Sequence, residues 1–566
     1  MFKIRFICFF IPLLCVQNLY SEEVFDTQDV VSHNNKTQNV SPNVPINLRG
    51  IFLIDSREHL LSSTELETYH GVHARYLPGK LSSLENKLSE NYLNAPITSG
   101  NILEIKEIVE KYFRDNNYPF VLVKVPTQKI SDGVLQVVVT ISTLEKITVE
   151  GACRTTPRLL TRYVSTKPCQ PINILDLQND VSFMNRNPYR HVDLVFAPGD
   201  CEGTTQAELV VDERRPVRIY AGADNTGLVR IKRQRLFAGL GFDLSYFNID
   251  HQFNFQYTTA YQPKDLQGYT GQYVAYLPMK HVFNAYGGYS TTQVQLPFPT
   301  MSNHGRFGQA SLRYTIPRHL STKVPLEWTF GFDYKNTNTS IFFSELYANS
   351  TSKNVNLAQF MTAGRLGFEG SRAHLELTAE IFFSPGAMLP DQSDARYDSL
   401  RPGAKPYYTY GKFAARYTQR LPADFSSALS VRGQVSSNAL LPSEQYGLGG
   451  YDTVRGYDEY QLNMDNALNV NYELRSPSIA VISMIRSIRM KDALQFLIFC
   501  DYGFGTNKDQ LPGEPSPSYL LSVGPGARYT LDPTVSMRLD WGWKLHKEPN
   551  YTGGASEVHF SAILSY

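Results

Sequence analysis

The sequence predicts a membrane all-β protein, a roughly 16-stranded antiparallel transmembrane β-barrel preceded by two small N-terminal α+β domains. Long segments that alternate apolar and polar residues fill the chain from residue 217 to its end. Glycine and aromatic residues are plentiful, and charged residues make up only 19% of the chain, below the usual share of a soluble domain. The N-terminal part repeats one order of strands and helices twice.

The chain begins with the features of a secretory signal peptide, predicted over residues 1–21. Lys3 and Arg5 give a basic start, residues 6–16 are apolar, and a small residue, Ser21, ends the segment. Residues 22–45 are polar and rich in Asn, Ser and Pro, which predicts a linker, with a short helix as the alternative.

Two α+β domains are predicted next, over residues 46–142 and 143–213. Each has the order strand, helix, helix, strand, strand. In the first domain the expected elements are 51–54, 81–92, 102–113, 120–125 and 133–139; in the second they are 144–149, 157–164, 174–184, 191–196 and 206–211. Tandem repeats of this kind usually carry a binding face, and two rigid spacers are the alternative.

One strand of the second domain is the predicted docking site for an extended peptide. An exposed strand edge captures such a peptide by adding it to the sheet, because backbone hydrogen bonds supply the affinity. The residues predicted to form this edge are His191, Val192, Asp193, Leu194, Val195 and Phe196.

The barrel is predicted over residues 214–566. In residues 535–546 every second residue is apolar and the others are polar or glycine, which suits lipid on one face and water on the other. Soluble strands are typically about 5–6 residues, so this length indicates a membrane strand. Strand starts are expected near residues 217, 235, 251, 272, 281, 306, 326, 357, 372, 407, 426, 467, 493, 519, 535 and 557. Barrels of about 14 or 18 strands are the alternatives.

A long glycine-rich excursion over residues 441–463 interrupts these strands, and it is long enough to fold into the lumen. It carries Val454, Arg455, Gly456 and Tyr457. Downstream, one strand contains Phe499, Asp501 and Gly503 at alternate positions, so these three point into the lumen while Cys500 and Tyr502 face lipid. We therefore expect an ion pair between Arg455 and Asp501, which indicates a regulated protein-conducting barrel.

The chain ends on an alternating apolar strand, residues 557–566, that finishes with Tyr566. It resembles the terminal recognition strand of outer-membrane proteins, where phenylalanine is the usual last residue. This strand must pair with the first barrel strand near residues 217–225, because an open sheet edge in lipid leaves backbone groups unpaired.

The motifs together resemble the TpsB family, the outer-membrane transporters of two-partner secretion that export haemolysins and filamentous haemagglutinin. Tyr118-Pro119 and residues 125–133 resemble the end of the family's first POTRA domain. Residues 185–188, Pro198-Gly199 and residues 213–216 resemble its second, and residues 224–227 resemble its first barrel strand. Residues 454–457 match the loop-tip motif, and residues 499–503 the wall motif that the tip engages.

The resemblance implies export of one large secreted β-rich partner from the periplasm to the cell surface, without enzymatic activity, cofactor or metal. Further implied partners are outer-membrane lipids and, during insertion, the barrel-assembly machinery; the implied state is a monomer or weak dimer. The near-zero net charge of +1 gives no sign of nucleic-acid binding. Some family members have an N-terminal plug helix, for which residues 22–45 are too short and too weakly helical.

Two other functions were weighed against export. A barrel-assembly insertase shares the loop motif, but two repeats rather than three to five favour the exporter. An enzyme in the barrel is the other alternative. The chain contains no Gly-x-Ser-x-Gly elbow and no His-Glu-x-x-His, and His374 and His559 are interpreted as lumenal or interfacial polar residues.

Three cysteines fall in the second α+β domain, which the resemblance places in the oxidising periplasm. In the expected domain fold the end of the first helix lies near the turn between the last two strands. Cys169 and Cys201 lie at these two points, so they are the predicted disulfide pair. A zinc site is the alternative, although the spacing has no Cys-x-x-Cys.

Overall fold

The structure is a computed structural model that describes residues 46–128, 133–229, 231–295, 302–338, 354–482, 491–510, 516–547 and 554–566. The predicted signal peptide and linker lie outside these residues. The chain divides into two compact units, one of Met1–Asn116 with Phe120–Ile141 and the other of Asn117–Pro119 with Ser142–Tyr566. Among the described residues, no helix has the length and apolar character needed to cross a bilayer.

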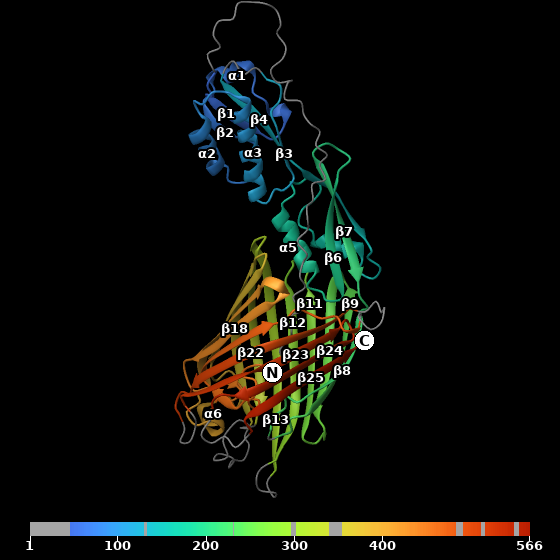
Figure 1. Cartoon of the computed structure of the whole chain (residues 1–566), viewed down its shortest axis with the longest axis vertical. Coiled ribbons are helices and arrows are strands. Elements are labelled where there is room, and N and C mark those ends of the chain that lie inside the picture. The colour runs from blue at the N-terminus through green and yellow to red at the C-terminus, as the bar shows by residue number, and fades with distance from the viewer. Residues whose placement is uncertain are drawn as a thin grey trace, which may run out of the picture. The chain divides into compact units, whose positions relative to one another are not determined.

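The first unit is a four-stranded sheet with helices packed on it (Figure 1). Its strands are β1 (Gly50–Ile54), β2 (Gly71–Ala74), β3 (Val121–Lys124) and β4 (Val134–Ile141), in the order β2-β1-β4-β3. Its helices are η2 (Arg57–His59), α1 (Ser63–Thr68), α2 (Ser82–Tyr92) and α3 (Ser99–Asp115). Helix α3 buries Ile105, Val109 and Phe113, because residues spaced by four lie on one helix face.

Helix α1 and strand β2 were not predicted from the sequence. Both are short, and α1 is mostly polar, so neither shows a periodic apolar face. A local signal for α1 is nevertheless present. Ser62 and Glu65 form a capping box, with the Ser62 N–H donating to the Glu65 carboxylate at 2.8 Å.

The second unit begins with a three-stranded sheet in the order β5-β7-β6. Its elements are β5 (Thr143–Glu150), α4 (Pro157–Tyr163), α5 (Ile174–Met184), β6 (Arg190–Pro198) and β7 (Thr204–Glu213). Strand β5 runs parallel to β7, and β6 is antiparallel to β7. This topology leaves β6 at one edge of the sheet, where the sequence predicted a docking strand.

The barrel that follows closes on itself with 16 strands, so the predicted count is confirmed and the alternatives of 14 and 18 are excluded. The strands are β8 (Val217–Asp224), β9 (Arg235–Tyr246), β10 (Ile249–Ala260), β11 (Leu266–Tyr276), β12 (Val282–Gln295), β13 (Ser302–Ser321), β14 (Val324–Thr337), β15 (Val355–Glu369), β16 (Ala373–Pro385), β17 (Tyr407–Arg420), β18 (Ser426–Ser436), β21 (Asn466–Arg475), β22 (Asp492–Thr506), β23 (Ser518–Leu531), β24 (Val535–Lys544) and β25 (Ser556–Ser565). Each predicted start lies within one of these strands or next to its first residue.

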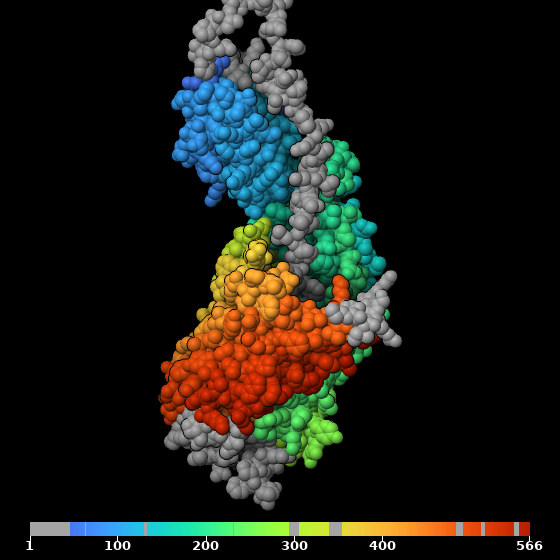
Figure 2. Space-filling view, viewed as in Figure 1, coloured from blue at the N-terminus to red at the C-terminus, as the bar shows by residue number. Residues whose placement is uncertain are grey.

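The barrel wall has an apolar outside and a polar inside, as the alternation predicted. On β24, Leu539 and Trp541 are 47% and 45% exposed, whereas Asp540 between them is fully buried. Strands β22 to β25 form a continuous outer surface in the space-filling view, in orange and red (Figure 2). The exposed apolar side chains suit contact with lipid tails, and the buried charges point inward.

The barrel closes where its last strand, β25, pairs with its first, β8. The register runs from Ser561 opposite Asp224 to Ser565 opposite Tyr220. Beyond it, Ile219 and Tyr566 exchange backbone hydrogen bonds in both directions, at 3.0 and 2.8 Å. The predicted pairing of the terminal strand is therefore confirmed.

Polar contacts hold the three-stranded sheet unit against one end of the barrel, at the turns that follow β9, β11 and β13. Arg190 pairs with Asp250 at 2.6 Å, and both side chains are buried. The Tyr163 hydroxyl donates to the carbonyl of Tyr276 at 3.1 Å, and Gln178 donates to the carbonyl of Thr322 at 2.7 Å. The chain also joins the sheet to the barrel directly, because β7 ends at Glu213 and β8 begins at Val217.

Two of the motifs found in the sequence have a structural role at this end. Asn187 donates to the Asp243 carboxylate on β9 at 3.0 Å. Glu213, at the end of β7, accepts the backbone N–H groups of Cys153, Arg154 and Thr155 at 3.1, 2.8 and 2.7 Å. Burial acts to raise the pKa of Glu213, but these N–H donors outweigh it and lower the pKa overall.

Candidate functional site: a loop tip held inside the barrel

The long excursion between β18 and β21 folds into the barrel and carries the predicted tip. It contains a short hairpin that the sequence reading treated as irregular, β19 (Tyr446–Leu448) paired with β20 (Leu462–Met464). The hairpin and tip bury an apolar cluster against the wall, made of Leu448, Val454, Tyr457, Leu462, Met464, Ala467 and Leu520. This packing holds the tip against the inner face of the wall.

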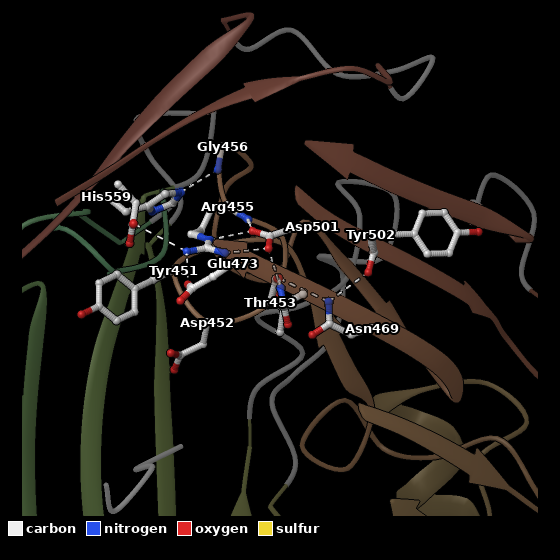
Figure 3. Close-up of polar contacts among 12 residues, drawn as sticks. Tyr451, Asp452, Thr453, Arg455, Gly456, Asn469, Glu473, Asp501, Tyr502 and His559 are labelled. Carbon is white, nitrogen blue, oxygen red and sulfur yellow. Dashed lines mark hydrogen bonds and ion pairs between the residues drawn. The ribbon is translucent and has the colours of Figure 1, made fainter. Parts of the chain in front are cut away.

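Arg455 at the tip is 3% exposed and is surrounded by carboxylates. Its Nε and Nη2 donate to the two oxygens of Asp501 at 2.7 and 2.8 Å, and its backbone N–H donates to Asp501 at 3.0 Å. Nη1 donates to Glu473 at 2.6 Å. Figure 3 shows Arg455 between these two acids. The predicted Arg455–Asp501 ion pair is therefore present, and it is bidentate, the strongest geometry for such a pair.

The wall motif on β22 provides both the acid and the space for the tip. Phe499 and Asp501 are buried, and Cys500 between them is exposed, as the alternation predicted. The Arg455 guanidinium carbon lies 3.7 Å from the centre of the Phe499 ring, a cation–π contact. A Cβ at Gly503 would lie 2.8 Å from Val454 Cγ2. Glycine at this position therefore makes room for the loop.

The two residues after Arg455 contact the last wall strands. The Tyr457 hydroxyl donates to the carbonyl of Leu521 at 3.0 Å. Gly456 has φ +89°, and its N–H donates to His559 Nε2 at 2.9 Å. A Cβ at Gly456 would lie 2.7 Å from the carbonyl oxygen of Gly542. Only glycine meets both requirements, because other residues are strained at this φ and would clash with the wall.

We expect Gly456→Ala to release the tip while the barrel still forms. The added methyl group must either push against β24 or force the backbone away from φ +89°, and the lumenal ion pair depends on that backbone. Protease accessibility of the loop in isolated outer membranes measures the release. Gly364→Ala is the matched control, because a Cβ there meets no atom within 4 Å. Equal protection of the loop in both variants would contradict the assigned packing.

Sequence reasoning missed several charged residues of the site. Arg528 and Arg538 contact Asp540 at 2.8 and 2.6 Å, and Arg475 contacts Glu473 at 2.6 Å. The strand alternation places each of them on the inward face, but which of them meet the tip depends on strand register and on where the loop folds in. His559 was interpreted as lumenal or interfacial, and the structure places it in the lumen.

The predicted docking edge on β6 is partly occupied. The Val192 N–H donates to Asn185 Oδ1 at 2.7 Å, and Asn185 Nδ2 donates back to the Val192 carbonyl at 2.9 Å. Backbone groups of alternate residues point to the same side of a strand. The backbone N–H and C=O groups of Val192 and Leu194 therefore point away from β7, whereas those of His191, Asp193 and Val195 point toward β7.

The predicted disulfide between Cys169 and Cys201 is wrong for this structure, in which both are exposed free thiols. Each backbone is held by local contacts rather than by a bridge. Cys169 has φ 66° and donates its N–H to the carbonyl of Leu144 at 2.7 Å. The Cys201 carbonyl instead accepts the N–H and hydroxyl of Thr204, which closes the β6–β7 turn. In the described part of the chain, no cluster of residues is suited to hold a metal ion.

Residues 203–529 match the model of the haemolysin secretion/activation protein family ShlB/FhaC/HecB. The chain belongs to this family. Residues 81–141 match the POTRA domain of ShlB type. ShlB/FhaC/HecB proteins are outer-membrane transporters of the TpsB type, with POTRA domains in the periplasm.

Relatives and solved structures agree with the family assignment. The chain is 24% identical over 387 residues to the outer membrane transporter CdiB of Dickeya dadantii, covering 66% of each protein. It is 21% identical over 483 residues to the heme/hemopexin transporter protein HuxB of Haemophilus influenzae, covering 80% of each. CdiB from Escherichia coli has the same fold, with a TM-score of 0.75, 16% identity and coverage of 94% and 93% of the two chains. These findings favour the exporter over the insertase.

Proposed function

We propose that this ShlB/FhaC/HecB-type transporter exports one large secreted β-rich protein through its barrel, and that the Arg455 tip regulates the channel. The observation that carries the proposal is a buried arginine at the end of an inward loop, bound to the carboxylates of Asp501 and Glu473 on the wall. A loop tip fixed inside the lumen by such an ion pair favours a regulated protein-conducting barrel over a passive porin. The proposal includes no catalytic step, cofactor or nucleic acid.

The periplasmic part supplies capture in this proposal. We assign residues 46–142 and 143–213 to two POTRA domains, residues 214–566 to the barrel, and residues 1–21 to a signal peptide. The partner arrives unfolded and adds a strand to the edge of β6, where backbone hydrogen bonds hold it without requiring a particular sequence. Folding of the partner outside the cell then draws the chain through. Outer-membrane lipids and the barrel-assembly machinery are the other partners, and the working form is a monomer or weak dimer.

Substitutions at Leu194 test whether the β6 edge captures the partner or only stabilises the domain. Leu194 follows Val192 on the outward side of β6, so Leu194→Pro removes an edge N–H and leaves the β7-facing groups of Asp193 and Val195 in place. We expect Leu194→Pro to abolish pull-down of the partner's N-terminal domain, with the barrel still inserted and heat-modifiable on gels. Leu194→Ala is the control, because it loses the same buried side chain but keeps the N–H.

The two variants give a clear decision. Retained capture by Leu194→Pro means that β6 is not the docking edge. Equal loss in both variants means that side-chain packing, rather than the backbone donor, supports binding. Export itself is tested by expressing the chain together with a large secreted β-rich protein from the same genome as the partner. Failure of the partner to reach the medium in cells with wild-type transporter would contradict the proposed function.

A further inference from the structure

The loop tip contacts the strand that closes the barrel as well as the wall motif. Gly456 donates its N–H to Nε2 of His559 at 2.9 Å, and His559 lies on β25, the terminal strand. The His559 side chain is 1% exposed. Nε2 accepts this hydrogen bond, so it carries no proton. The proton of the neutral ring is therefore on Nδ1. Figure 3 shows this contact on the side of Arg455 away from Asn469.

The position of His559 is fixed by the barrel seam itself. Asn225, just after β8, donates from Nδ2 to the carbonyl of Val558 at 2.6 Å and accepts the N–H of Phe560 at 2.7 Å. These are the two neighbours of His559, so one side chain of the first strand's end clamps the backbone on both sides of the histidine. The acceptor nitrogen therefore reaches Gly456 only when the first and last strands are in register.

A second set of contacts joins the β8–β9 connection, the terminal strand β25 and the inward loop. Arg233, in the connection from β8 to β9, pairs with Glu557 on β25 at 2.9 Å and also with Asp458 of the inward loop. Glu557 and His559 are two apart on one strand and share its inward face. The tip is thus tied to the seam through a neutral hydrogen bond at Gly456 and an ion pair at Asp458.

We infer that His559 is a positioning residue for the loop tip, which accepts the Gly456 N–H and so couples docking of the tip to closure of the barrel at the β8–β25 seam. The inference rests on the proposed function for the regulatory role of the tip. It adds a point of attachment on the terminal strand β25, separate from the Arg455–Asp501 pair on β22. Without this acceptor the Gly456 N–H loses its partner, and docking of the tip, including the Arg455 ion pair, is weakened.

Three substitutions at one position test the inference. In His559→Gln the amide oxygen reaches as far as Nε2 and accepts the same N–H. In His559→Asn the same amide is one methylene shorter and falls short of Gly456. His559→Leu removes the acceptor and keeps a comparable bulk. Each full-length variant is purified from outer membranes, checked for heat-modifiability, and recorded in planar lipid bilayers, where a released tip increases the time spent in open conductance states.

We expect His559→Asn and His559→Leu to increase the ratio of open to closed time by about fivefold, the size expected for one lost hydrogen bond. His559→Gln should stay near wild type. Closed-state times in Leu and Asn equal to wild type would overturn the inference. A Gln variant that behaves like Leu would also overturn it, because packing would then explain the effect. The Gln and Asn pair decides the matter if Leu fails to insert.

The recordings use no partner protein, which keeps this test separate from the proposed function. A wild-type chain that exports no partner, with the ordered response of Gln, Asn and Leu intact, would remove the export proposal and leave the role of His559 standing. Normal export by wild type, with no difference among the three variants, would remove the role of His559 and leave the export proposal standing.

Discussion

Arg455→Ala is expected to abolish export of the partner while leaving the barrel inserted in the outer membrane. The substitution leaves Asp501, which is fully buried, without its bidentate partner. Removing one member of a buried ion pair typically costs about 3–5 kcal/mol. The loss falls on docking of the loop, since the barrel wall is held by its own strand pairing. The measurement is partner protein in the medium, relative to transporter in the outer membrane.

Further variants separate the role of the tip from general lumenal charge. Arg455→Lys should also be defective, because a lysine cannot make the two-pronged contact with Asp501. Arg416→Ala is the matched control: Arg416 shares a face of β17 with the buried Tyr410, yet its own side chain is exposed. Arg455→Ala with Asp501→Ala removes both charges, and we expect it to leave the barrel inserted without restoring export. Unchanged export by Arg455→Ala would refute the assignment of the tip.

Deletion of residues 560–566 is expected to eliminate the protein from the outer membrane. Every paired residue of β25 at the seam, Ser561 to Ser565, is removed with this segment, and β8 is then left with an open edge. In lipid each unpaired backbone group costs several kcal/mol, so an open barrel is not stable there. We expect degradation in the periplasm, measured by immunoblots of fractionated cells.

Tyr566→Phe is the control for this deletion and should be silent. Tyr566 is 76% exposed, and the Arg215 guanidinium carbon lies 4.9 Å from the centre of its ring. Phenylalanine keeps the ring and its cation–π contact and offers the usual terminal residue. Normal outer-membrane amounts of the truncated chain would contradict the closure of the barrel by β25.

Local sequence pattern was sufficient for most of the secondary structure. Alternation marked all the barrel strands, because each must present one face to lipid and the other to water along its full length. Helix α5 was predicted at the bounds observed, Ile174–Met184. Helix α1 and strand β2 were missed, since six and four residues are too few to show a period. The Ser62–Glu65 capping box was the available signal for α1.

The same alternation predicted the wall residues of the functional site and the ion pair that holds the loop tip. The sequence by itself determined that Phe499, Asp501 and Gly503 face the lumen, and that an arginine on a long glycine-rich loop was the natural partner for Asp501. Those conclusions need only the two-residue period of a strand and the attraction of opposite charges. They do not need the order of strands around the barrel.

Only the tertiary structure decided which other strands meet the tip. Strands β22 to β25 are consecutive in the wall, and the inward loop lies against all of them, which places Asp540, Gly542 and His559 around Arg455 and Gly456. It also showed that Asn185 occupies part of the β6 edge and that Cys169 and Cys201 stay unbonded. Contacts of this kind join residues far apart in the chain, so they depend on register and closure, which no local pattern encodes.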